Sequence, residues 1–327
     1  MVNFVEAQKS LLHFVMKMAG VIPHAVEIQP GTVMNIWVPI GTIKTPKKRN
    51  KLATTIPTSN AGVVVTSSDA AKPSKPVVVL LHGFAGEGIL TWQFQVGWLK
   101  KYAIYVPDLL FFGGSVTDSA DRSPAFQAEC LAKGLRKLGV EKCTVVGFSY
   151  GGMVAFKMAE LFPELVEALV VSGAIMATTD DIITHMVNSL GFSTSSDMLL
   201  PTSVKGLKAL FKVATYRKLR IPNRFYKDFL EVMYGNRKER SELLEGMVVS
   251  KDITIPAFPQ RIHLLWGEND QIFKLELAQE MKEKLGSKTT FQGIKKAGHL
   301  VHLERPCVYN RFLKQFLASL YGDKPKK

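Results

Sequence analysis

A serine at position 149 lies in a sequence pattern that suits a nucleophile. The segment VVGFSYGG (145–152) indicates a buried strand, a sharp turn over Gly147-Phe148-Ser149-Tyr150-Gly151, and the start of a helix. This is the G-x-S-x-G pattern in the strand–turn–helix context of a nucleophile elbow. The strained turn exposes the serine Oγ, and the flanking glycines let strand and helix approach without Cβ clashes. The pattern therefore predicts that Ser149 is a catalytic nucleophile.

A serine hydroxyl needs a neighbouring base, and an elbow of this kind is followed in the chain first by an acid and then by a histidine. The segment LLWGENDQIF (264–273) places Asp270 just beyond a buried strand, and KKAGHLVHLERP (295–306) places His299 in a loop before the final helix. We expect His299 to act as the base and Asp270 to hold its tautomer and stabilise the imidazolium.

Each of these two positions has alternatives nearby. Glu268 precedes Asp270 by two residues, and His302 follows His299 by three. Asp180 and Asp181 follow an earlier strand, at a place where some hydrolases carry the acid. We expect His302 to be a packed or surface histidine.

The segment VVVLLHGFAGEG (77–88) interrupts a buried strand with a glycine-containing loop. Acyl transfer develops an oxyanion that preorganised N–H donors stabilise. We predict that the backbone N–H groups of Phe84 and Tyr150 form this oxyanion hole, because one donor follows the nucleophile and the other comes from the loop after an early strand. His82 is expected to be structural, with its ring hydrogen-bonded within the loop.

Continuous apolar strands alternate with helices along most of the chain, which predicts an α/β fold with a mostly parallel sheet covered by helices on both faces. The expected strands are a strand–turn–strand unit at 25–40 and single strands at 76–81, 102–110, 142–149, 166–175, 260–267 and 289–299. The expected helices cover 91–101, 123–139, 150–163, 274–286 and 308–322. The region 176–257 shows helical patterns only, so we expect a core of 25–175 and 258–322 with a helical lid at 176–257.

The first 24 residues predict an amphipathic helix. Glu6, Lys9, Ser10, His13 and Lys17 share one side at about 100° per residue. The other side carries apolar residues, namely Phe4, Leu11, Leu12, Phe14, Val15 and Met18. Such a helix either lies in a membrane interface or docks on its own domain, and the sequence leaves both open.

The chain has 327 residues, 46% of them hydrophobic and 21% charged, and a net charge of +14 with a pI near 9.6. These values are typical of a globular protein attracted to anionic surfaces. We found no nucleic-acid-binding motif. Basic stretches such as KTPKKRNK (44–51) are expected to be solvated positive segments, and the alternative is contact with lipid headgroups through residues 1–22 and these basic patches.

Three widely spaced cysteines, Cys130, Cys143 and Cys307, indicate reduced thiols in an intracellular protein. No apolar run is long enough to span a membrane, and Glu6, Lys9 and Lys17 interrupt any signal-peptide core. The expected location is cytoplasmic or peripheral to a membrane.

The segments LLHGFAGEG, VPDLLFFGGS, VGFSYGGMVAFKMAELFPELV, LLWGENDQIF and AGHLVHLERP together resemble the α/β-hydrolase superfamily over about residues 76–320. The amino-acid sequences of VPDLLFFGGS and SYGGMVAF are most similar to plant members of the superfamily whose substrates are unassigned. The stretch from RIPNRFYKDFLEVM to LLWGENDQIF is similar to the α/β-hydrolase-domain monoacylglycerol lipases. Epoxide hydrolases and haloalkane dehalogenases of this superfamily carry Asp as the nucleophile, which Ser149 replaces here.

The resemblance and the residues together predict a serine hydrolase that cleaves a lipid or small acyl ester through an acyl-enzyme, with no metal or organic cofactor. The alternatives are a carbon–carbon bond hydrolase, which would use the same three residues, and a receptor-like binding protein on the same fold. Trp92, Phe111, Phe112 and Met153 are candidates to line the acyl pocket, with ordinary core packing as their alternative role.

Overall fold

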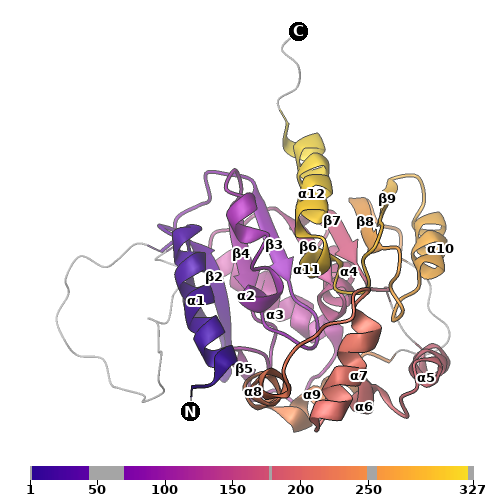
Figure 1. The fold of residues 1–327 in the computed structure, drawn as a ribbon. Helices are drawn as coiled ribbons and strands as arrows, with labels where there is room; N and C mark the ends of the chain where they lie inside the picture. Colours follow the sequence, from indigo (N-terminus) through magenta and orange to yellow (C-terminus); the bar gives the residue numbers. More distant parts are fainter. Residues whose placement is uncertain (1, 44–69, 177–178, 249–255, 323–327) are drawn as a thin grey trace.

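The computed structural model describes residues 2–43, 70–176, 179–248 and 256–322 (Figure 1). Their strands form a nine-stranded sheet in the order β1-β2-β4-β3-β6-β7-β8-β9, with β5 paired to β2. Strands β3, β4, β6, β7, β8 and β9 run parallel, whereas β1, β2 and β5 join by antiparallel pairing. The bounds are β1 Val21–Gln29, β2 Thr32–Pro39, β3 Val77–Leu81, β4 Ala103–Pro107, β5 Val116–Thr117, β6 Cys143–Phe148, β7 Val166–Ser172, β8 Arg261–Gly267 and β9 Thr289–Ile294.

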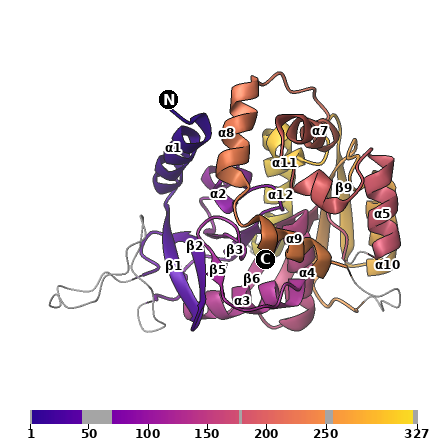
Figure 2. The same cartoon turned by 90° about the horizontal axis from the view of Figure 1, so that it is seen from below.

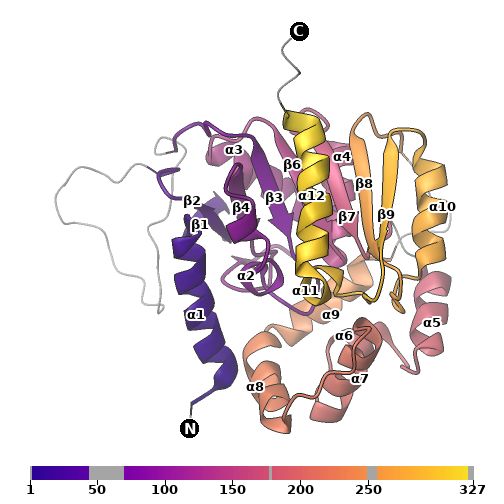
Figure 3. The same cartoon turned by 45° about the horizontal axis from the view of Figure 1, so that its top comes forward.

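Helices cover both faces of this sheet, so the parallel strands are buried on two sides, as their continuous apolar sequences predict. Figure 3 shows α12 across one face of the sheet, with α3 and α4 behind it. The segment around η1 packs in the same core cluster as α12, whereas α10 contributes to the cluster that contains α3 and α4. The α/β fold predicted from the sequence is confirmed. The bounds are α2 Gly88–Thr91, η1 Val96–Trp98, α3 Pro124–Lys137, α4 Tyr150–Leu161, α10 Leu275–Leu285, α11 Val301–Glu304 and α12 Pro306–Tyr321.

Between β7 and β8 the described residues form only helices. They are α5 Asp180–Ser189, α6 Ser195–Leu199, α7 Val204–Ala214, α8 Asn223–Met233 and α9 Arg237–Gly246. Figure 2 shows this group of helices together, with α8 beside the N-terminal helix α1 (Phe4–Met18). The group lies at the edge of the sheet where the parallel strands end, and we refer to residues 179–248 as the helical insertion.

The expected helix at 91–101 is wrong. The structure has a four-residue helix, α2, followed by the single 3-10 turn η1. Trp92 is fully buried, and the Gln95 amide donates hydrogen bonds to the His302 carbonyl oxygen and to Asn310 Oδ1. These long-range hydrogen bonds and the burial of Trp92 fix the segment in short turns, and a continuous helix would not place both side chains in these positions.

The parallel strands bring distant segments to one edge of the sheet. β6 pairs with β3 on one side and with β7 on the other, and β7 pairs with β8. The loops that follow these four strands begin at His82, Ser149, Gly173 and Glu268. Because the carboxyl ends of adjacent parallel strands meet at one edge, residues far apart in the chain become neighbours there.

The expectations about the basic stretches, the cysteines and membrane-spanning segments can be compared with the structure only where it describes the chain. The basic segment 44–51 and the last five residues lie outside the described residues. Cys130 and Cys143 are buried free thiols, and Cys307 is an exposed one. Among the described residues, no helix has both the length and the apolar character needed to cross a membrane.

Candidate active site

Ser149 occupies a strained turn between β6 and α4. Its backbone has φ 52° and ψ −122°, a conformation that non-glycine residues rarely adopt. The turn is tight enough to require its glycines, because a Cβ on Gly147 would lie 2.5 Å from the Gly151 carbonyl oxygen. A Cβ on Gly151 would lie equally close, at 2.5 Å, to the His82 carbonyl oxygen. The local structure is therefore the elbow that the spacing G-x-S-x-G predicts.

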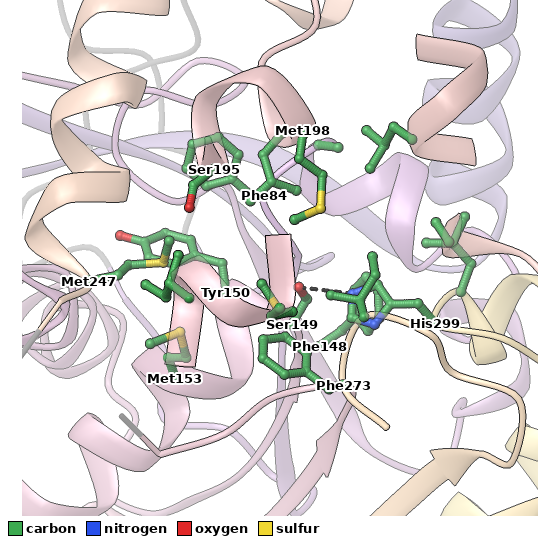
Figure 4. A pocket seen from close by; sticks show the side chains of 18 of the residues that line it. Phe84, Phe148, Ser149, Tyr150, Met153, Ser195, Met198, Met247, Phe273 and His299 are labelled. Carbon is green, nitrogen blue, oxygen red and sulfur yellow. Dashed lines mark hydrogen bonds between the residues drawn. The ribbon is translucent and has the colours of Figure 1, made fainter. Parts of the chain in front are cut away.

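The structure brings Ser149, His299 and Asp270 into one hydrogen-bonded chain. His299 Nε2 lies 3.1 Å from Ser149 Oγ, and His299 Nδ1 lies 2.9 Å from Asp270 Oδ2 (Figure 4 shows the bond to Ser149). A carboxylate only accepts, so the ring nitrogen facing Asp270 carries the proton and Nε2 is free to accept from the serine hydroxyl. This is the tautomer that a general base for Ser149 requires.

Asp270 is held by more than the histidine. Its Oδ1 accepts hydrogen bonds from the backbone N–H groups of Ile272 and Phe273, both at 2.9 Å. Its side chain is 1% exposed and that of His299 is 6% exposed, so the pair is screened little by water. The two backbone donors fix the carboxylate, which in turn fixes the imidazole ring.

The neighbouring carboxylates take no part in this chain of contacts. Glu268 is half-buried, and its side chain packs beside Gly293 of β9. Asp180 and Asp181 are exposed in the first turn of α5. Of these four carboxylates, it is Asp270 that the geometry places in hydrogen-bond contact with His299.

His302 is fully buried against aromatic rings, with Phe148 at 4.4 Å and Trp92 at 5.1 Å between ring centroids. Neither of its ring nitrogens has a hydrogen-bond partner among the described residues. Burial lowers the pKa of His302 to about 3, which keeps the ring neutral. Its position is that of a packed core histidine.

The loop after β3 is organised by His82, as expected. Its Nδ1 donates to the Gly83 carbonyl oxygen at 2.7 Å, and its Nε2 accepts the Leu109 N–H at 2.9 Å. These two bonds fix the tautomer, and burial lowers the pKa of His82 to about 4. His82 therefore acts as a neutral brace that joins the loop after β3 to the segment after β4.

Two buried backbone donors flank Ser149. Phe84 is 3% exposed and Tyr150 is 2% exposed, and their rings meet edge to face at 5.8 Å. Neither backbone N–H donates a hydrogen bond to another described residue. Nearly all buried N–H groups in proteins are paired, so two without a partner among the described residues are unusual.

An apolar pocket opens over Ser149 and His299, with an empty volume of about 830 Å³. Figure 4 shows side chains from the core and from the helical insertion around it. Apart from Ser149, His299 and Ser195, the lining side chains are hydrophobic or aromatic, and none is Lys or Arg.

Of the four expected pocket residues, only Met153 lines this cavity. Trp92, Phe111 and Phe112 are buried in the core instead. Sequence analysis missed the lining residues of the insertion, which are Ile183, Met186, Ser195, Met198, Leu199, Leu210, Phe211, Ala214 and Met247. The helical spacing of apolar residues in 198–214 signals a buried face there, but not what that face covers.

Sequence analysis also missed Gly173, which follows β7 directly. It has φ +54°, and a Cβ there would lie 2.8 Å from His299 Cε1 and Nδ1. The His299 ring therefore lies against a position where only glycine fits. The sequence did carry a signal for a functional position, because a glycine directly follows the buried strand β7, which is adjacent to β6.

Comparisons with known proteins agree with this architecture. The family described as alpha/beta hydrolase fold matches residues 76–197. Monoacylglycerol lipase ABHD6 of Bos taurus is 27% identical over 283 residues, covering 77% of this chain and 79% of the relative. Epoxide hydrolase 4 of Homo sapiens is 25% identical over 272 residues, covering 76% of this chain and 74% of the relative.

A solved structure, a putative lipase (lip1) from Acinetobacter baumannii AYE, superposes with a TM-score of 0.73 at 18% identity and covers 97% of both chains. At this identity the likeness concerns the fold alone. Together with the sheet order, the elbow and the sequence relatives, it shows that the chain has the α/β-hydrolase fold and is similar to the ABHD6 monoacylglycerol lipases.

Proposed function

We propose that the protein is a serine hydrolase that cleaves a carboxylic ester with an apolar acyl group. The observation that carries the proposal is the hydrogen-bonded chain Ser149–His299–Asp270, which opens into a cavity whose described lining residues include no Lys or Arg. A hydroxyl with a correctly oriented base beside it is the arrangement that acyl transfer needs. Relatives named as lipases are consistent with a lipid or other acyl ester as the substrate.

In the first half of the reaction, Ser149 Oγ attacks the ester carbonyl carbon while His299 Nε2 takes its proton. The carbonyl oxygen becomes an oxyanion, which the N–H groups of Phe84 and Tyr150 stabilise. Asp270 keeps Nδ1 protonated and stabilises the imidazolium. His299 then returns the proton to the leaving alkoxide, which departs as the alcohol and leaves an acyl-serine.

In the second half, His299 removes a proton from water, which attacks the acyl-serine carbonyl. A second oxyanion forms in the same place and collapses as His299 returns its proton to Ser149 Oγ, which releases the carboxylic acid and regenerates the serine hydroxyl. The acyl chain lies among the apolar side chains of the pocket, and the helical insertion acts as a lid that keeps it out of water. In this proposal the lid comprises residues 176–257, and the core comprises residues 25–175 and 258–322.

The alternatives fit this site less well. Three neighbours in fold are named as meta-cleavage product hydrolases or as a 2-hydroxy-6-oxo-6-phenylhexa-2,4-dienoate hydrolase, and a dienoate carboxylate needs a polar or cationic partner in its site. In the described part of the chain, no Lys or Arg lines this pocket. Epoxide opening through an aspartyl ester is not supported, because residue 149 is a serine. A purely receptor-like role would not require a base oriented toward Ser149.

Labelling with a fluorophosphonate probe tests the proposal. The wild-type protein should be labelled, and Ser149→Ala should not be, with the fold of both checked by circular dichroism. A panel of p-nitrophenyl esters and monoacylglycerols should show turnover that Ser149→Ala reduces by several orders of magnitude. A Ser149→Ala variant that retains near-normal turnover would overturn the assignment of the nucleophile.

A further inference from the structure

Helix α1 carries two separate apolar faces. Val5, Leu12 and Met16 are buried against the rest of the protein, so the expectation that Leu12 shares a face with Phe4 and Leu11 is wrong. The second face lies roughly 120° around the helix from the first. It is exposed along its whole length, with Phe4 at 54%, Leu11 at 61%, Phe14 at 60%, Val15 at 40% and Met18 at 70%.

The helix is firmly attached, so this exposure is a property of the docked state. Lys9 pairs with the buried Glu87 of the core at 3.1 Å, and His13 packs on Trp37 with centroids 4.8 Å apart. The Phe4 N–H donates to Asp228 Oδ2 of α8 at 2.8 Å. A helix that served only to complete the core would need one apolar face, and the second face remains unexplained by packing.

A basic segment adjoins the start of this helix. Between Met198 and Lys227 the sequence holds eight cationic side chains and no carboxylate. Lys205, Lys208 and Lys212 are exposed at helical spacing on α7, so they share one side of that helix. The following loop exposes the cations Arg217, Lys218 and Arg220 together with the apolar groups of Tyr216, at 45%, and Leu219, at 43%.

The two features lie at the same end of the molecule. Arg224, in the first turn of α8, donates a hydrogen bond to the Val2 carbonyl oxygen at 2.7 Å, just before α1 begins. Figures 2 and 3 show α1 running alongside α8 toward the end where α7 and α8 are joined. The inner sides of α6 and α7 line the apolar pocket, so the basic segment lies on the outer side of the elements that roof it.

We propose that the exposed face of α1 and the basic segment 205–227 together form a docking surface for an anionic lipid bilayer. Apolar side chains on a fixed helix enter the boundary between headgroups and acyl chains, and nearby lysines and arginines attract anionic headgroups. A second copy of this chain is a poor occupant, because pairing this surface with itself would oppose like charges. The overall charge of +14 favours the same anionic partner.

Co-sedimentation of the full chain with vesicles tests the proposal. We expect binding to vesicles of phosphatidylcholine with about one-third phosphatidylserine, weaker binding to phosphatidylcholine alone, and release as salt is raised. The double variant Leu11→Ser/Phe14→Ser should weaken binding at least about tenfold, since it removes two apolar groups from the exposed face only. The double variant Lys218→Glu/Arg220→Glu should lose the preference for phosphatidylserine.

Matched variants control for general effects of polarity and charge. Leu161→Ser/Ile182→Ser replaces two exposed apolar residues, at 41% and 43%, on α4 and α5. Lys282→Glu/Lys284→Glu makes the same change in net charge on α10. Both controls should bind vesicles as the wild type does, and thermal unfolding should show that all variants fold.

The readout is binding, so it is independent of the proposed hydrolase activity. The proposal fails if the wild type does not bind phosphatidylserine vesicles, or if the two control variants lose binding as much as the test variants. It also fails if sedimentation velocity shows a dimer that Leu11→Ser/Phe14→Ser dissolves while vesicle binding is unchanged, because a second copy would then be the occupant of this face.

Discussion

His299 rests against Gly173, with the imidazole Cε1 only 2.8 Å from the place where a Cβ on residue 173 would stand. The ring also contacts Phe148, whose centroid lies 4.9 Å from that of His299. The two hydrogen bonds of the imidazole set its rotation, and this packing sets its position. The geometry of the base thus depends on a residue that carries no functional group.

Gly173→Ala should impair the reaction without removing any catalytic group. The new methyl displaces the His299 ring from Ser149, and an error of about 1 Å in a catalytic group costs on the order of 10²-fold in rate. The value of kcat on a p-nitrophenyl ester should fall by about this factor, and the rate of fluorophosphonate labelling should fall in parallel.

The same substitution also strains the backbone, because Gly173 has φ +54°. Gly191→Ala is the matched control, since Gly191 has φ +83° and nothing within 4 Å of an added Cβ. Gly191→Ala should lose a similar amount of stability, about 1 kcal/mol, and keep its activity. Equal losses of kcat in both variants would show that backbone strain, and not contact with His299, is responsible.

Asp270→Asn should invert the tautomer of His299 while leaving the loop intact. The asparagine Oδ1 can still accept from the N–H groups of Ile272 and Phe273, but its Nδ2 donates toward His299 Nδ1. His299 Nε2 then carries the proton and cannot accept one from Ser149. We expect kcat to fall by about 10⁴-fold with little change in melting temperature.

Glu268→Gln provides the comparison for that experiment. Glu268 precedes Asp270 by two residues and is not hydrogen-bonded to His299. Replacing its carboxylate by the amide of glutamine should therefore leave kcat nearly unchanged. If Glu268→Gln were the more damaging of the two changes, the acid of the site would have to be reassigned.

The sequence predicts the residues of the site better than the cavity around them. Ser149, Asp270 and His299 are predictable because strand ends and turn glycines leave local patterns, and a parallel sheet gathers strand ends at one edge. The lining from α6 and α7 was not predictable, because apolar periodicity reports burial and not the partner that is buried. The division of the apolar residues of α1 into two faces was not predicted for the same reason, since a helical wheel cannot tell a docked apolar face from an exposed one.

His302→Phe should retain activity and make the protein less sensitive to acid. The ring of His302 packs among Trp92, Phe148 and Tyr309, and its nitrogens have no partner among the described residues, so an apolar ring suits the site. Removing the unpaired polar atoms should stabilise the fold by roughly 1 kcal/mol at neutral pH. Activity measured beside His299→Phe separates the two histidines, and loss of turnover in both would contradict the packed role of His302.

The direction of the pH effect follows from the depressed pKa. Burial lowers the pKa of His302 to about 3, whereas an unfolded histidine titrates near 6.5. Between these values the unfolded chain binds a proton that the folded chain does not, so the free energy of unfolding falls as pH falls, by about 1.4 kcal/mol per pH unit for one group. His302→Phe should reduce this slope by about one proton between pH 6 and pH 4, measured by urea unfolding at each pH. An unchanged slope would show that His302 does not contribute.

Leu210→Trp should shorten the range of esters that the enzyme accepts. Leu210 is 3% exposed on α7 and lines the pocket from the insertion side, away from the hydrogen bonds of Ser149. A larger ring there takes volume from the region that we assign to the acyl chain, whereas an acetyl group needs only the space next to Ser149. Because even one methylene changes selectivity by about 10–200-fold, kcat/KM for long-chain p-nitrophenyl esters should fall at least about tenfold relative to the acetate. The acetate serves as the internal control for folding and for the intact Ser149–His299 pair. Equal losses for all chain lengths would place the acyl chain elsewhere in the molecule.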